Sequence, residues 1–206
     1  AGEFDGVIAI TLDALTIPAA SGIDSTIAVL LNASNGSDGI VMKGNDKRVE
    51  DLDGERVNLV QFSGSHYLLA RAFDESGMSE RDVTVVNTSD ADIIAAFQSP
   101  DTQAVVTWKP QLSEIVQQNP DTTILFDSAD IPNEITDALL LHTETLNKHP
   151  ELGHALAGAW YEVMSMLESG HPKRDEVIEH MAESVGTDRE GFLKQMATIK
   201  FFSPDE

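Results

Sequence analysis

Short apolar runs rich in β-branched residues alternate with polar turns over the first two thirds of the chain. Such runs predict buried β-strands, and the helical segments between them have apolar residues every three or four positions. From residue 79 onward the alternation is regular, which is typical of an open, mostly parallel α/β sheet. The predicted strands are residues 4–11, 26–31, 40–43, 56–61, 83–87, 104–107 and 122–126, and the predicted helices are residues 66–76, 90–98 and 112–118.

Beyond residue 132 the hydrophobic pattern becomes mainly helical, after one last apolar run at residues 135–142. Apolar side chains at helical spacing predict three helices, at residues 150–169, 173–184 and 189–197. Thr187 is expected to cap the last of these helices, with Glu190 completing a capping box.

The predicted elements divide the chain into three portions, residues 1–44, 45–127 and 128–206. The first portion holds too few elements for a complete lobe, because buried parallel strands need neighbours on both sides and helices on both faces. The helical tail could supply what is lacking. We therefore expect two α/β lobes: a discontinuous and incomplete first lobe of residues 1–44 and 128–206, and a second lobe of residues 45–127.

The charge composition of the chain excludes some classes of binding partner. The 206 residues include 13 Lys and Arg against 35 Asp and Glu, a net charge of −22. A surface that acidic repels nucleic acid and anionic lipid, so we expect neither as a partner. It also resembles proteins that work in salty surroundings, where repulsion between carboxylates is screened.

Cys is absent, which excludes disulfides, thiolate metal sites and Cys nucleophiles. Residues 1–5 contain no secretory signal.

Polar side chains follow several predicted strands, at the end where open α/β sheets bind ligands. Asp13 follows the first strand, either facing a ligand or capping the next helix. Ser63, Gly64 and Ser65, followed by His66, lie between a strand and a helix. Small residues there let the backbone approach a solute, and hydroxyls and helix N-terminal amides donate hydrogen bonds. The alternative is capping, with Ser65 as the N-cap.

The next two strands end in similar turns. Thr88, Ser89 and Asp90 place two hydroxyls and a carboxylate at the start of a predicted helix, and capping by Ser89 or Asp90 is the alternative. Trp108 ends the following strand and offers a flat apolar or cation–π surface, unless it packs within the lobe. Lys109 is expected to be solvated. The binding-site hypothesis requires that these turns converge on one pocket.

Four segments together resemble the solute-binding proteins of ABC importers, in the nitrate/sulfonate/taurine and thiamine-precursor-like group. They are ITLDAL at residues 10–15, DLDGERVNLVQFSGSHYLLARAF at 51–73, DVTVVNTSDADIIAAF at 82–97 and AVVTWKPQLSEI at 104–115. The densest stretch is most similar to the branch encoded near urea carboxylases, which is labelled a urea-type transporter component. The resemblance covers essentially the whole chain.

The resemblance implies a type II periplasmic-binding fold, in which two α/β lobes close around a small solute and present it to an ABC permease. It implies a periplasmic or other extracytoplasmic location, and it places a ligand-binding turn at residues 63–66. Family members begin with a signal peptide and a strand–helix–strand unit that has no counterpart here. If that unit is missing, an exposed sheet edge results, which invites dimerisation.

The expected ligand is a small neutral or cationic nitrogen compound. Asp13, Asp90 and Trp108 would suit urea, a guanidine-like compound or an amidine better than nitrate or a sulfonate, because an anion prefers Arg or Lys and no basic residue occurs in those turns.

No cofactor, metal or catalytic group is expected. A serine next to His66 cannot form a catalytic triad, and the other five histidines lack an HExxH pattern. The acidic residues 127–130 lack calcium-loop spacing. Two alternatives stay open: an enzyme on the same fold related to thiamine-pyrimidine synthesis, against which the absence of Cys argues, and a ligand-sensing module of a signalling protein.

Overall fold

The computed structural model describes residues 4–204, except for the side chains of residues 17–19, and its contacts divide the chain into two units. Unit 1 comprises residues up to Ser34 and from Asn133 onward, and unit 2 comprises Asn35–Pro132. The boundaries therefore fall after residues 34 and 132, whereas the sequence placed them after residues 44 and 127.

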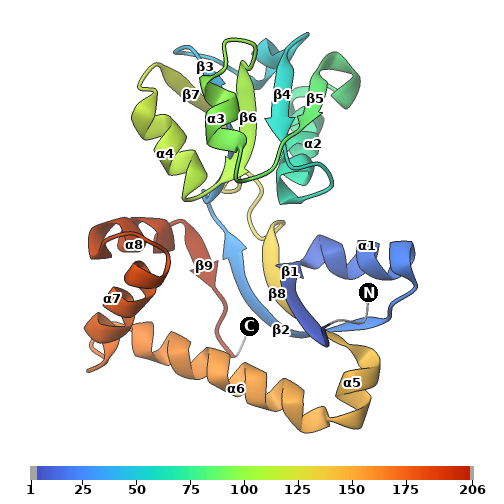
Figure 1. Ribbon diagram of the computed structural model, residues 1–206, viewed down its shortest axis with the longest axis vertical. Coiled ribbons are helices and arrows are strands. Elements are labelled where there is room, and N and C mark those ends of the chain that lie inside the picture. The colour runs from blue at the N-terminus through green and yellow to red at the C-terminus, as the bar shows by residue number, and fades with distance from the viewer. Residues whose placement is uncertain (1–3, 205–206) are drawn as a thin grey trace. The chain divides into compact units, whose positions relative to one another are not determined.

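Unit 2 is built on a five-stranded sheet in the order β5-β4-β6-β3-β7 (Figure 1). β4 is parallel to β5 and β6, whereas β3 runs antiparallel to both β6 and β7. All strands except β3 therefore point the same way, as the alternation of strands and helices predicted. The strands are β3 (Asp38–Lys43), β4 (Arg56–Leu59), β5 (Thr84–Asn87), β6 (Ala104–Trp108) and β7 (Thr122–Asp127).

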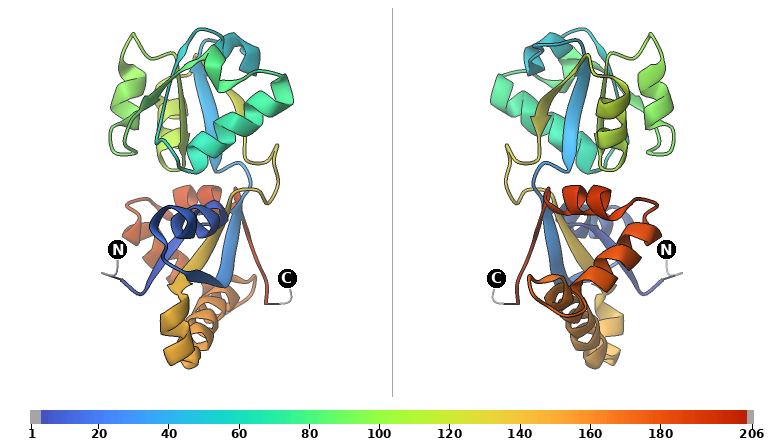
Figure 2. Two further views of the ribbon diagram at one scale, coloured as in Figure 1. Left: turned by 90° about the vertical axis from the view of Figure 1, so that its right-hand side faces the viewer. Right: turned by 90° about the vertical axis from the view of Figure 1, so that its left-hand side faces the viewer.

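Helices cover both faces of this sheet, with α2 on one face and α3 and α4 on the other (Figure 2). The short η1 (Val49–Leu52) and η2 (Glu80–Asp82) flank α2 (Gly64–Ser76), which ends where Gly77 adopts a φ of 72°. α3 (Ile93–Gln98) and α4 (Gln111–Gln118) contribute to a core cluster with the sheet. The buried members of that cluster are Val41, Ile93, Phe97, Val105, Leu112 and Ile115.

Unit 1 holds a four-stranded sheet in the order β1-β8-β2-β9, in which every neighbouring pair is antiparallel. Its strands are β1 (Gly6–Ile10), β2 (Ser25–Ser34), β8 (Thr136–His142) and β9 (Ile199–Phe201). The helices are α1 (Thr11–Ser21), α5 (Thr143–Lys148), α6 (Pro150–Leu167), α7 (Arg174–Ser184) and α8 (Arg189–Met196). β9 brings the end of the helical tail back onto β2.

The cap of α8 differs from the sequence prediction. Asp188, not Thr187, is the N-cap, and its Oδ1 accepts a hydrogen bond from the backbone N–H of Gly191 at 2.8 Å. Glu190 does not close a capping box but pairs with Lys194, with 2.7 Å between Oε1 and Nζ.

Within residues 4–204 no helix is both long and apolar enough to cross a lipid bilayer.

Candidate functional site

Four strands of unit 2 end at one edge of its sheet. β4, β5 and β6 are parallel, and β7 shares their direction because it and β6 both run antiparallel to β3. The turns after these strands therefore lie along the same edge, where open α/β sheets bind ligands. Eight of the nine predicted site residues belong to these turns or to the strand and helix ends beside them: Ser63, Gly64, Ser65, His66, Thr88, Ser89, Asp90 and Trp108.

The ninth, Asp13, belongs to unit 1. It lies inside the first turn of α1, two residues after the helix begins, and is half-buried. Burial raises the pKa of its carboxyl above the ordinary value, against the opposing effect of a backbone hydrogen bond at Ile10. Its role in ligand binding stays a prediction.

The turn after β4 is organised by Ser63, which is the N-cap of α2, so the alternative of capping by Ser65 is wrong. Ser63 Oγ donates to the carbonyl of Val60 at 2.7 Å and accepts from the backbone N–H of Ser65 at 3.1 Å. Gly64 is the first residue of α2. Ser65 is only 1% exposed, and its own hydroxyl has no hydrogen-bond partner. Capping therefore does not explain Ser65, whose hydroxyl is buried and has no partner within the protein.

His66 is held by protein groups at both ring nitrogens. Its Nδ1 accepts a hydrogen bond from the backbone N–H of Phe62 at 3.2 Å, and its Nε2 lies 3.3 Å from Glu80 Oε2. The rings of Phe62 and His66 are in contact, with centroids 5.7 Å apart. His66 therefore fixes the conformation of the turn. Its main contact in the turn is Phe62, which was not among the predicted site residues.

The turn after β5 is largely satisfied internally. Thr88 Oγ1 accepts from Asn58 Nδ2 at 2.9 Å and donates to the carbonyl of Val86 at 3.2 Å. Ser89 Oγ donates to Asp92 Oδ2 at 2.7 Å, and Asp92 is the N-cap of α3, so the capping alternatives at Ser89 and Asp90 are wrong. Asp90 is exposed.

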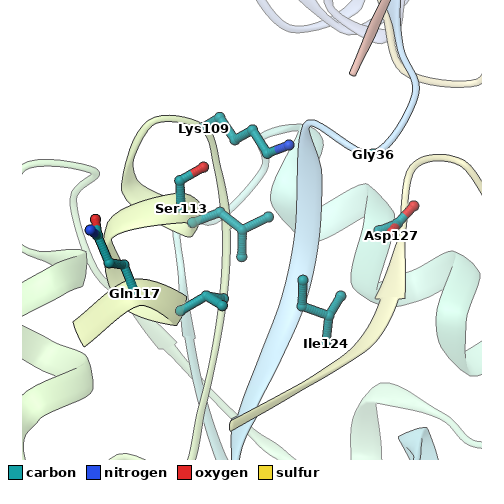
Figure 3. A pocket seen from close by; sticks show the side chains of 8 residues that line it. Gly36, Lys109, Ser113, Gln117, Ile124 and Asp127 are labelled. Atoms are coloured by element: carbon teal, nitrogen blue, oxygen red, sulfur yellow. The ribbon is translucent and has the colours of Figure 1, made fainter. Parts of the chain in front are cut away.

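The end of β6 leads into a cavity of about 320 Å³ beside α4 (Figure 3). Trp108 is half-buried and ends the strand, and Lys109 comes next and lines the cavity. Figure 3 shows Lys109 and Asp127 on either side of the start of β3. The cavity is lined by Gly36, Lys109, Leu112, Ser113, Val116, Gln117, Ile124 and Asp127.

Lys109 overturns one expectation from the sequence. It is half-buried rather than fully solvated, and desolvation lowers the pKa of its ammonium group, although the nearby Asp127 carboxylate acts in the opposite direction. A basic residue therefore does follow one of the predicted turns. The apolar side chains of Leu112, Val116 and Ile124 beside it form a surface suited to the hydrocarbon part of a small organic ion.

Unpaired buried polar atoms also mark this edge. Ser65 Oγ, Thr107 Oγ1 and Gln111 Oε1 are buried without a hydrogen-bond partner. Thr107 precedes the last residue of β6, and Gln111 is the first residue of α4. Leaving such atoms unpaired costs about 1–3 kcal/mol each unless a ligand or water satisfies them.

Among residues 4–204, no group of three or more His, Asp or Glu side chains could hold a metal ion.

The arrangement of strands and helices is that of periplasmic solute-binding proteins, as the sequence predicted. One similar structure is the alkanesulfonate-binding protein of Xanthomonas axonopodis pv. citri, solved with bound MOPS. The match covers 98% of this chain and 69% of that protein, with a TM-score of 0.83 and 21% sequence identity. For the periplasmic aliphatic sulphonate-binding protein of Escherichia coli, the match covers 99% of this chain and 70% of that protein, with a TM-score of 0.78 and 24% sequence identity.

Residues 14–163 match the NMT1/THI5 like family model, and the chain belongs to that family. The taurine-binding periplasmic protein of Escherichia coli strain K12 is 27% identical over 146 residues, which is 69% of this chain but 45% of that protein. The chain therefore spans about half the length of the curated relatives it matches. These relatives are binding proteins rather than enzymes, as was expected of this chain.

Proposed function

We propose that this chain forms part of the extracytoplasmic solute-binding component of an ABC importer, and that it binds a small organic sulfonate. The ligand would lie at the carboxyl edge of the unit 2 sheet, with its anionic group next to Lys109. The observation that carries the proposal is the half-buried residue Lys109 beside a cavity with mainly apolar walls. A sulfonate has both the charge and the hydrocarbon part that such a lining recognises.

Two further features support this choice. The taurine-binding relative is named for a sulfonate ligand, and the buried hydroxyl of Ser65, at the start of α2, has no hydrogen-bond partner within the protein. The proposal replaces the argument for a neutral or cationic solute, which rested on the absence of a basic residue from these turns.

A urea-, guanidine- or amidine-like solute is the second candidate. The exposed carboxylate of Asp90 and the Asp127 carboxylate at the cavity favour it, because both would attract an N–H donor or a cation. A permease would be the protein partner in either case.

The test is a titration of the 206-residue chain with ethanesulfonate, taurine, nitrate, urea and guanidinium, followed by calorimetry. Trp108 fluorescence gives a second readout, and the Trp160→Phe variant removes the signal of the other tryptophan. We expect saturable sulfonate binding without consumption of the ligand. Binding of urea or guanidinium in preference to every sulfonate would contradict the proposal, and turnover of the ligand would indicate an enzyme.

A further inference from the structure

Phe62 is exposed in a backbone conformation that is unusual for its residue type. The side chain is 85% exposed, and its φ is 63°, in the left-handed region that bulky residues rarely adopt. It lies in the turn between β4 and α2, immediately before the N-cap Ser63. An exposed aromatic ring contributes nothing to the core of unit 2, and backbone strain of this kind is concentrated at ligand sites.

The surrounding hydrogen bonds hold this conformation in place. The backbone N–H of Phe62 donates to His66 Nδ1, and His66 Nε2 lies 3.3 Å from a carboxylate oxygen of Glu80. Because Nδ1 accepts a hydrogen bond, the ring proton is on Nε2, where it points to Glu80. On the other side of Phe62, the N–H of Gln61 donates to Asn87 Oδ1 at 3.0 Å.

The turn that contains Phe62 follows β4, at the edge of the sheet that holds the proposed anion site. β4 and β6 are hydrogen-bonded neighbours, and adjacent strands are about 4.8 Å apart. Phe62 follows β4 by three residues, and Lys109 follows β6 directly. Ser65, whose buried hydroxyl is unpaired, is the second residue of α2, three positions after Phe62. Lys109 and the exposed Phe62 thus follow adjacent strands at the same edge of the sheet, although Phe62 does not line the cavity beside Lys109.

We propose that Phe62 contacts the apolar part of the solute and that His66 is the positioning residue that holds it there. This inference rests on the proposed function, and it adds that the site prefers sulfonates with a longer hydrocarbon chain. An aromatic ring gains affinity by removing alkyl surface from water, so its contribution grows with the chain length of the ligand. Methanesulfonate, with a single carbon, would gain almost nothing from Phe62.

The experiment compares methanesulfonate with hexanesulfonate by calorimetry on the wild-type chain and on Phe62→Ala. We expect Phe62→Ala to weaken hexanesulfonate binding about tenfold, roughly the effect of exposing two methylene groups. Methanesulfonate affinity should change less than about twofold. Val185→Ala is the matched control, because Val185 is also an exposed apolar residue, 56% exposed, but belongs to unit 1. It should alter neither affinity.

The role of His66 is tested by two variants. His66→Ala removes the acceptor for the Phe62 N–H and should reduce hexanesulfonate affinity selectively, whereas His66→Asn keeps an acceptor near the position of Nδ1 and should restore most of it. Phe62→Gly relieves the positive φ, so its melting temperature should not fall while its preference for hexanesulfonate is lost.

The outcomes separate this inference from the proposed function. If the wild-type chain binds both sulfonates and Phe62→Ala keeps the full preference for hexanesulfonate, the role of Phe62 is wrong and the proposed function stands. If His66→Ala binds like the wild type, the positioning role is wrong. If the wild-type chain binds neither sulfonate, the proposed function fails and this inference fails with it.

Discussion

Replacing Lys109 by Met tests the proposed anion site most directly, because it removes the charge and keeps the length of the side chain. Lys109 forms no ion pair with any residue in the described part of the chain, although the Asp127 carboxylate influences its pKa. Two unit charges at about 4 Å attract by about 4 kcal/mol at an effective dielectric constant of 20. Loss of hydration reduces this, and hydrogen bonds to charged groups contribute about 1.5–3 kcal/mol net. We expect a loss of about 2 kcal/mol, or about 30-fold in affinity.

The assay is calorimetric titration with ethanesulfonate, in parallel with Lys148→Met. Lys148 is an exposed residue of unit 1 that pairs with Glu144 at 2.6 Å, so its replacement makes the same change in net charge without touching the edge of the unit 2 sheet. Lys148→Met should bind like the wild type. Equal affinities of Lys109→Met and the wild type would refute the assignment of Lys109.

The pH dependence of binding gives an independent check. Only the protonated ammonium attracts a sulfonate, so bound anion raises the pKa of Lys109 and affinity falls as pH rises through the pKa of the free protein. Desolvation places the pKa of Lys109 below the ordinary 10.5, so sulfonate affinity should begin to fall at a lower pH than it would beside an exposed lysine. Lys109→Arg keeps its charge throughout this range and should remove the pH dependence. An unchanged pH profile in Lys109→Arg would mean that another group titrates.

Four further predictions concern stability and assembly. Asp188→Ala should lower the free energy of unfolding by about 1 kcal/mol in thermal denaturation, whereas Thr187→Ala should have little effect. Burial raises the pKa of Asp137, so its charge destabilises the fold above that pKa; Asp137→Asn should melt higher than the wild type at neutral pH, and the difference should vanish below pH 3.8. β1 exposes Val7 and Ile8, so sedimentation should detect a dimer that Val7→Lys dissociates, and a monomeric wild type would refute pairing through this edge. Salt should raise the melting temperature by screening the net charge of −22, and a melting temperature independent of salt would exclude this effect.

Local patterns predicted most strands and helices, but not the place of β3. The sequence predicted a strand at residues 40–43 but not its position in the sheet. The strand lies between β6 and β7, and its residues from Gly39 to Met42 are buried. A strand buried on both faces has no alternation of polar and apolar positions, and its partners come from sequence-distant segments. β9 escaped prediction for a similar reason, because its three residues form a strand only by pairing with β2.

The site was predictable as a set of turns but not as a charged pocket. Small and polar residues at strand ends are a local signal, so Ser63 and its neighbours were found. Lys109 was missed because nothing within its own turn indicates burial. The groups that surround it, Gly36 and Asp127, are far away in sequence and come together only through pairing of β3 with β6 and β7. Phe62 was missed because an apolar residue after a strand usually predicts core packing.

The net charge of −22 and an anionic ligand are compatible once the range of electrostatic forces is considered. At physiological ionic strength the field of an exposed carboxylate is screened beyond about 8 Å, so most of the 35 acidic residues act weakly on an ion bound at one edge of the sheet. A nucleic acid, by contrast, would bring many phosphates close to many carboxylates at once. A partly desolvated ammonium interacts more strongly at short range than the screened surface does. The acidic composition therefore argues against a polyanion without arguing against a small sulfonate held beside Lys109.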